Sequence, residues 1–517
     1  MLKDIRRLFA VMMLSTTVMA CAQSNILTPT HLPSPSTTPP SMATPMATPT
    51  LTPSTPDLEP YQVAMIPSAR SDVATVSYPI FYDITATVDL SGGQPILHAV
   101  QEMTYVNTEN APMDEVYFIL HPNAPGRGGS LDVEGLTVDG VSRAPLYEQD
   151  RFALCVDLGR AISPGQTAQI VMTYTVTVPS GNHYNYGTFN YQDNVLTLAN
   201  FYPMLAVYDD HWNLEMPPSY GDPAFSETSL FRVSLTVPDD MVVAMSGTTI
   251  DRQQNADGTV TLTALSGPMR EFMIAMSPDF EVVSSTLGDT TIHSYYKAGD
   301  AEGGALVLQY VRDSLRIYNR DFGTYPFAEL DIVEAPVTAG GVEYPGLILM
   351  AASRYGMEGD IFEFAAVHEA IHQWWYSVVG NDQVDVPWLD ESLTNYSTVF
   401  YYQAVYNRQV AETVIQQRFR AKYEDALAAG RDQVVGRPVA AFTAKDYGTI
   451  VYGKGPLFFH ALRERVGDAT YLDIMRAYYQ DRKYQIATPE DFLRVAEAVS
   501  GQNIRDLYEQ WILGAQG

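Results

Sequence analysis

The hydrophobic pattern of this 517-residue chain changes once, near Gly288, and this change limits the folds open to it. Before it, segments such as "YDITATVDL" and "FRVSLTVP" alternate apolar and polar residues, which is typical of half-buried strands. After it, "ALVLQYVRDSLRIY" spaces apolar residues three and four apart, as one face of a helix does. A chain of this length is expected to form more than one domain. The sequence therefore predicts an N-terminal antiparallel β-sandwich domain over 69–281 and a mainly helical α+β domain over 282–517.

The first 68 residues show two patterns of their own. Basic residues followed by the apolar run "LFAVMMLSTTVMA" predict an export signal over 1–20. Its "VMAC" ending resembles the bacterial lipobox, in which the cysteine, here Cys21, is lipidated; cleavage that leaves a free cysteine is the alternative. The rest of 21–68 is rich in Ser, Thr and Pro and predicts a disordered tether. We therefore expect an extracytoplasmic protein of the bacterial cell envelope, attached to the membrane through a lipid anchor only.

The composition excludes some classes of partner. The formal charge is −29 and the isoelectric point is about 4.5. No block of lysine or arginine follows the first few residues, so binding of nucleic acid or of anionic lipid headgroups is disfavoured. The acidity fits either a solvated surface or a preference for cationic substrates. Only two cysteines are present, so no disulfide framework is expected.

The stretch "AVHEAIHQWW" lies in a segment that is apolar almost all round, which predicts a buried helix. His368 and His372 are one turn apart on one face, so both imidazoles can reach one ion, and Glu369 lies beside them. The alternative is a core helix that happens to carry two histidines. Glu391, within "WLDESLTNY", supplies a third ligand. Two histidines and a carboxylate are the ligand set of a catalytic zinc, so we expect one zinc ion per chain, with Glu369 as general base toward the zinc-activated water.

Three polar residues near the third ligand are candidates to orient the metal ligands. They are Asp390, Ser392 and Asn395. Groups of these types commonly hydrogen-bond the ligands of a metal from behind. Ordinary roles at the start and surface of a helix are the alternative.

The order H-E-x-x-H, eighteen residues, then E resembles the gluzincin aminopeptidases, the family of aminopeptidase N. "GGVEYPGL" resembles the G-x-M-E-N motif of that family, which implies that Glu343 binds the α-amino group of a substrate, with Gly340 and Gly341 beside it. "YGKGPLFF" resembles the family's Y-x-K-G segment, which implies that Tyr452 stabilises the tetrahedral intermediate; Tyr447 is its rival. The resemblance also implies a thermolysin-like catalytic domain.

The chain ends soon after Trp511, so the resemblance is to a short form that lacks the C-terminal domains of longer members. The leading hypothesis is a zinc aminopeptidase that acts outside the cytoplasm on peptides with a free N-terminus. The alternatives are a zinc endopeptidase with an open cleft and a non-catalytic surface binding protein on the same fold. The preferred N-terminal residue, the physiological substrate and the oligomeric state stay open.

Overall fold

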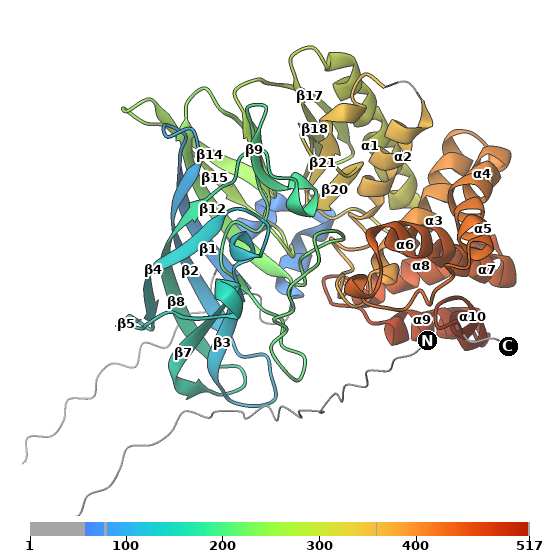
Figure 1. The fold of residues 1–517 in the computed structure, drawn as a ribbon, viewed down its shortest axis with the longest axis horizontal. Coiled ribbons are helices and arrows are strands. Elements are labelled where there is room, and N and C mark those ends of the chain that lie inside the picture. The colour runs from blue at the N-terminus through green and yellow to red at the C-terminus, as the bar shows by residue number, and fades with distance from the viewer. Residues whose placement is uncertain (1–56, 77–79, 358, 515–517) are drawn as a thin grey trace, which may run out of the picture. The chain divides into compact units, whose positions relative to one another are not determined.

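The structure, a computed structural model, describes residues 57–76, 80–357 and 359–514 (Figure 1). Within them the strands come mostly first and the longer helices follow, so the change of hydrophobic period marks a change of architecture. The export signal predicted over 1–20 and Cys21 lie outside the described residues. In the part of the chain that is described, no helix is both long and apolar enough to cross a membrane.

The largest sheet has eight strands in the order β14-β15-β12-β1-β2-β8-β4-β5. Buried and exposed residues alternate along its strands, so one face packs on the core. Neighbouring strands are antiparallel except β1 and β12, which run parallel with Ile84 opposite Val233. The strands are β1 (Ile80–Asp89), β2 (Ile96–Val106), β4 (Ser130–Val138), β5 (Val141–Ser142), β8 (Thr167–Thr177), β12 (Ser229–Pro238), β14 (Thr248–Gln254) and β15 (Thr259–Leu265).

Two four-stranded antiparallel sheets complete the strand-rich half, in the orders β13-β16-β10-β9 and β11-β3-β7-β6. Strands β10 and β16 are buried along their whole length, and all but one residue of each is apolar. The strands are β3 (Met113–Ile119), β6 (Leu146–Glu148), β7 (Ala153–Ile162), β9 (Phe189–Gln192), β10 (Val195–Leu198), β11 (Met204–Leu205), β13 (Val242–Met245) and β16 (Ile274–Ser277).

A five-stranded mixed sheet, β17-β18-β19-β21-β20, begins the second half. β18, β19 and β21 are parallel, and the edge strands β17 and β20 are antiparallel to their neighbours. Helix α1 packs against β17 and β18 (Figure 1). The predicted domain boundary at 281/282 falls inside β17. The strands are β17 (Phe280–Leu287), β18 (Thr290–Lys297), β19 (Glu329–Ala335), β20 (Gly341–Tyr344) and β21 (Leu347–Ala351).

Helices make up the rest of the described chain. In α1 the residues at helical spacing, Leu308, Val311, Leu315 and Tyr318, are buried as the pattern predicts. A β-sheet region followed by a mainly helical α+β region confirms the predicted fold class. The helices are α1 (Ala301–Asp321), α2 (Asp360–Ile371), α3 (Trp388–Val405), α4 (Arg408–Val414), α5 (Ala421–Ala428), α6 (Ala444–Thr449), α7 (Gly455–Val466), α8 (Asp468–Arg482), α9 (Pro489–Ser500) and α10 (Arg505–Trp511).

Residues 57–68 differ from the prediction of a disordered tether that reaches residue 68. They form a short helical turn, Glu59–Ala64, and the start of a second one. Met65 and Ile66 are buried, and the Ile66 amide donates to the Pro326 carbonyl oxygen at 3.0 Å. The physical reason is that these apolar side chains give a proline-containing segment enough buried surface to hold it in place.

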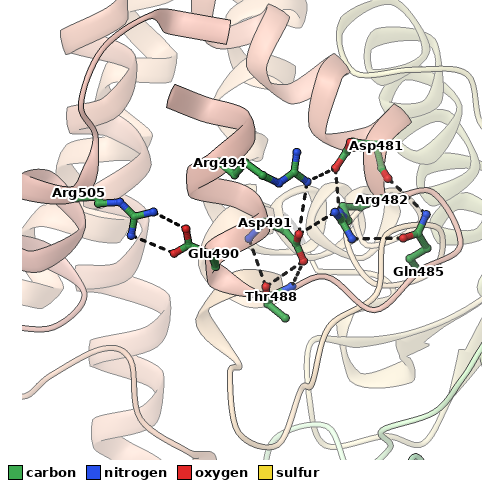
Figure 2. Close-up of polar contacts among 8 residues, drawn as sticks. All are labelled: Asp481, Arg482, Gln485, Thr488, Glu490, Asp491, Arg494 and Arg505. Carbon is green, nitrogen blue, oxygen red and sulfur yellow. Dashed lines mark hydrogen bonds and ion pairs between the residues drawn. The ribbon is translucent and has the colours of Figure 1, made fainter. Parts of the chain in front are cut away.

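A polar network fixes the turn between α8 and α9 (Figure 2). The Thr488 hydroxyl accepts from the Asp491 amide, and the Asp491 carboxylate accepts from the Thr488 amide at 3.1 Å, which is a capping box. Arg482 pairs with Asp491 at 2.7 Å, and Arg494 pairs with Asp481 at 2.5 Å. These contacts fix the residues between the two helices, which pair with the segment that follows α2.

Candidate metal centre

Helix α2 carries the two histidines inside the protein. It contacts α1, α3, β20 and β21, and its apolar residues face these neighbours on several sides. His368 and His372 lie one turn apart, and His372 is the residue that ends the helix. Both are buried, with 9% and 0% of their surface exposed. A buried imidazole requires a polar partner or a metal.

The three predicted metal ligands converge on one point. The Nε2 atoms of His368 and His372 are 3.1 Å apart, and Glu391 Oε2 lies 3.2 Å from the first and 3.5 Å from the second. Tetrahedral zinc bonds of about 2.1 Å would place ligand atoms about 3.4 Å apart, so the spacing fits such an ion. Among the described residues Glu391 Oε2 is buried without a hydrogen-bond donor. The donor set therefore fits zinc in both chemistry and geometry.

Asp390 holds His372 from behind. Its Oδ1 lies 2.6 Å from His372 Nδ1, and its Oδ2 accepts a hydrogen bond from Gln383 at 2.6 Å. A carboxylate at Nδ1 keeps the proton on that nitrogen and leaves the Nε2 lone pair free for a metal. The sequence alone did not decide whether Asp390 orients a metal ligand. Its contact with His372 Nδ1 places it where it can do so.

Ser392 and Asn395 hold the segment that carries Tyr452. The Ser392 hydroxyl donates to the Val451 carbonyl oxygen at 2.6 Å, and the Asn395 amide donates to the Tyr452 carbonyl oxygen at 3.1 Å. A side chain at Gly455 would place its Cβ 2.0 Å from Ser392 Oγ. The glycine of the K-G pair therefore lets this segment approach α3.

Tyr452, and not Tyr447, faces the three ligands. The Tyr452 hydroxyl donates to Glu391 Oε1, and its ring lies 5.9 Å from the His368 ring. Burial, and then the charge of Glu391, raise the pKa of Tyr452 well above its usual value, so the hydroxyl keeps its proton and stays a donor. The Tyr447 hydroxyl is buried without a hydrogen-bond partner in the described chain and does not line the cavity beside the ligands.

Two glycines, Gly340 just before β20 and Gly341 at its start, let this strand approach α2 and Glu369. A Cβ on Gly341 would lie 2.4 Å from Glu369 Cγ, and one on Gly340 would lie 3.3 Å from Ala365 Cβ. The backbone of β20 therefore approaches α2 closely because these residues lack side chains. Burial raises the pKa of Glu369, an environment suited to a carboxylate that exchanges protons.

A second carboxylate, Asp222, lies beside Glu343, and the sequence did not indicate it. One oxygen from each of Asp222, Glu343 and Glu391 lies within 4.8 Å of the others. Glu343 is 6% exposed, and its Oε1 has no hydrogen-bond donor among the described residues. Burial raises the pKa of both Asp222 and Glu343, and the charge next to each adds to the shift. The two carboxylates form an acidic subsite next to the metal ligands, and a cation bound there would favour their charged forms.

The loop between β11 and β12 delivers Asp222 from the strand-rich half. The Gly221 amide donates to the Tyr186 hydroxyl at 2.7 Å, and the Asn185 amide donates to the Gly221 carbonyl oxygen at 3.1 Å. Gly221 has a φ of +76°, and a Cβ there would lie 2.9 Å from Val439. The Tyr220 hydroxyl donates to the Phe442 carbonyl oxygen at 2.5 Å. The backbone on the N-terminal side of Asp222 is thus fixed from both halves of the chain.

These side chains line one cavity of about 330 Å³. Its polar wall includes His368, Glu369, Glu391, Glu343, Asp222 and Tyr452. Its apolar wall includes Ala339, Val342, Phe364 and Ala365. The structure thus brings every predicted site residue of the described chain to one place, including Gly340 and Gly341. His372 lies directly behind this wall.

Comparison with known proteins identifies the domain that carries this centre. Residues 307–511 match the family model described as the Peptidase family M1 domain. The chain carries a peptidase M1 domain. The resemblance to the aminopeptidase N family is thereby confirmed.

Relatives of this chain are found among aminopeptidases. Aminopeptidase M1-B from Oryza sativa subsp. japonica is 24% identical over 314 residues, which cover 57% of this chain and 35% of the relative. Probable aminopeptidase 2 from Sulfurisphaera tokodaii is 22% identical over 318 residues, which cover 58% and 39%. The match thus spans little more than a third of the length of these relatives.

Solved M1 structures share the fold over most of the chain. An M1 zinc metallopeptidase from Deinococcus radiodurans aligns with a TM-score of 0.62 at 20% identity and covers 84% of this chain and 93% of that one. A mutant of a two-domain M1 zinc metallopeptidase bound to L-arginine aligns with a TM-score of 0.63 at 20% identity and covers 84% and 94%. At these identities the likeness supports the fold alone.

Proposed function

We propose that this M1 chain is a zinc-dependent aminopeptidase that removes N-terminal residues from peptides. The observation that carries the proposal is the position of Asp222 and Glu343 beside His368, His372 and Glu391, with oxygens of Asp222, Glu343 and Glu391 within 4.8 Å of one another. A hydrolytic centre next to a subsite for a positive charge suits a substrate whose α-ammonium lies one residue from the scissile bond. The names of the aminopeptidase relatives agree with this substrate class.

His368, His372 and Glu391 would hold the zinc ion. When bound, it supplies Lewis-acid activation of the attacking water and of the scissile carbonyl group. Asp390 keeps His372 in the tautomer that binds metal, through the 2.6 Å contact with its Nδ1.

The remaining steps belong to side chains of the cavity. Glu369 accepts a proton from the attacking water and returns it to the leaving amine. Tyr452 donates its hydroxyl proton in a hydrogen bond to the oxyanion that develops on the carbonyl. Glu343 and Asp222 accept hydrogen bonds from the substrate ammonium and so fix which bond lies at the centre.

The test is a panel of amino-acyl arylamides offered free and N-acetylated, with and without a chelator. Hydrolysis of the free substrates that the chelator abolishes, with the acetylated ones left intact, is the expected result. Equal hydrolysis of both forms would favour the open-cleft endopeptidase. The absence of any hydrolysis by zinc-loaded protein would favour the non-catalytic binding protein.

We further propose that the enzyme acts outside the cytoplasm while anchored to the membrane through lipidated Cys21. The support is the apolar run and "VMAC" ending of the first residues. One acyl chain binds a membrane only marginally, so stable anchoring needs a multiply acylated cysteine. Cys21→Ser should release the protein from the membrane fraction, and wild-type protein recovered wholly soluble would contradict the proposal.

A further inference from the structure

A second group of metal-ligating side chains lies on the five-stranded sheet, on strands that carry none of the catalytic ligands. It consists of His293 on β18 and of Glu329 and Asp331 on β19. The two strands are parallel, and His293 lies opposite Asp331 in their register. Because side chains on a strand alternate, Glu329, two residues before Asp331, projects from the same face. Helix α1 covers the opposite face, where its Gly304 lies against Tyr296 of β18.

The three side chains are close enough to share one ion. A ring nitrogen of His293 and one oxygen from each carboxylate lie within 4.8 Å of one another. A divalent ion with ligand bonds of about 2.1 Å needs its ligand atoms about 3–4 Å apart, so small side-chain rotations would close the site. The His293 Nδ1 atom is already engaged by the Ser284 hydroxyl at 2.6 Å, which leaves Nε2 as the ligand atom.

The carboxylates have no cation of the protein beside them. Asp331 is 1% exposed, and its carboxylate accepts hydrogen bonds from the Met245 amide and the Tyr295 hydroxyl. Its Oδ1 atom still has no hydrogen-bond donor in the part of the chain that the structure describes. Among the described residues, no lysine or arginine charge lowers the pKa of Glu329 or Asp331. Apolar residues of β13, β16 and β19 pack together on this side of the sheet, so water offers little compensation to Asp331. Two adjacent carboxylates without a counter-charge are costly to bury, and a divalent cation would remove that cost.

We propose that His293, Glu329 and Asp331 bind a second divalent transition-metal cation, of the class of Zn²⁺ or Mn²⁺, which joins β18 to β19. One imidazole and two carboxylates suit either ion. His293 and Glu329 are only partly buried, so water can complete the coordination. The role is structural, because the ion would link neighbouring strands of the sheet.

The test is metal stoichiometry in the full chain, measured without any activity assay. Protein stripped with a chelator is titrated calorimetrically with Zn²⁺ and, separately, with Mn²⁺. Wild type should bind two equivalents of Zn²⁺, and a His368→Ala/His372→Ala variant should still bind one. A variant with Glu329→Gln and Asp331→Asn should lose the second equivalent, whereas Glu281→Gln, on the opposite face of β17, should keep it. One equivalent in wild type and none in the histidine variant would overturn the proposal.

Thermal unfolding gives a second readout, which does not require the variant with both Glu329→Gln and Asp331→Asn to fold well. Added Zn²⁺ should raise the Tm of the His368→Ala/His372→Ala protein, because only the folded state presents the second site. Asp331→Asn in that background should abolish the rise. In metal-free protein Asp331→Asn should raise the Tm, since it relieves two like charges. If added Zn²⁺ leaves the Tm of the His368→Ala/His372→Ala protein unchanged, the second site is contradicted.

Discussion

Asp222→Asn tests whether the loop between β11 and β12 helps to recognise the substrate amino group. The change keeps the shape of the side chain and removes its charge. A hydrogen bond between an ammonium and a carboxylate is worth about 1.5–3 kcal/mol, and solvent reduces this because Asp222 is only partly buried. Since about 1.4 kcal/mol corresponds to a factor of ten, kcat/KM on a free amino-acyl arylamide should fall by roughly 10- to 30-fold.

Glu343→Gln serves as the matched comparison. Glu343 is 6% exposed, so its charge is less screened, and its loss should cost about 2–4 kcal/mol on the same substrate. Because the two carboxylates would bind one ammonium, the double variant should lose less than the sum of the single losses. The assay is kcat/KM for free and N-acetylated substrates on all four proteins.

Asp222→Asn should change stability in the direction opposite to its effect on activity. Asp222, Glu343 and Glu391 crowd three carboxylates within 4.8 Å, so Asp222→Asn should raise the Tm of the metal-free protein while it lowers activity. A variant that loses activity equally on free and acetylated substrates would show that Asp222 does not bind the amino group. A variant that loses both activity and Tm would show a structural role for the loop instead.

Three further outcomes follow from the geometry. A chelator should abolish hydrolysis and lower the Tm, and added Zn²⁺ should restore both, because the ion binds only the folded His368, His372 and Glu391; activity that survives complete zinc removal would refute the centre. Tyr452→Phe should lower kcat by about 100-fold with little change in KM, whereas Tyr447→Phe should stay close to wild type; the reverse order would transfer the oxyanion role to Tyr447. Burial raises the pKa of Glu334 to about 7, so the folded state holds this proton at pH values where the unfolded state has lost it. The free energy of unfolding should therefore fall as the pH rises from about 4.5 to 7. Glu334→Gln should reduce that fall by about 1–3 kcal/mol in urea unfolding at pH 5 and pH 8, and an unchanged pH dependence would contradict the assignment.

Local sequence spacing predicts what a single helix or turn decides. The i, i+4 relation of His368 and His372 is set by one helical turn, so the sequence is sufficient to pair them. Glu391 lies on the next helix, and its spacing after His372, which matches the family pattern, indicated it as the third ligand. The sequence could not place Asp222, because its approach to Glu343 depends on the path of a long loop and on a glycine with positive φ. No short motif surrounds it that would have indicated a ligand.

Pairings between strands that are distant in the chain could not be predicted either, because local patterns do not determine which strands become neighbours. Alternation along β1 and β12 predicts two half-buried strands, but it is the same for parallel and antiparallel neighbours. The structure pairs them in parallel. His293 and Asp331 likewise become neighbours only through the register of β18 and β19, which lie on either side of α1 in the chain. The sequence shows residues of types that bind metals, but it does not show that His293 and Asp331 lie next to each other.

The contacts of Arg270 explain why a loop of the strand-rich half can serve the centre in the helical half. Arg270 is 2% exposed and follows the loop and β12 along the chain. Its guanidinium group donates to three carbonyl oxygens, those of Tyr376 at 3.0 Å, Ser226 at 3.1 Å and Gln485 at 2.6 Å. Tyr376 follows the metal-binding helix α2, and Ser226 lies four residues after Asp222. One buried cation therefore fixes the loop and the backbone beyond His372 to the same point, and this bond network limits how far the acidic subsite can move from the metal ligands.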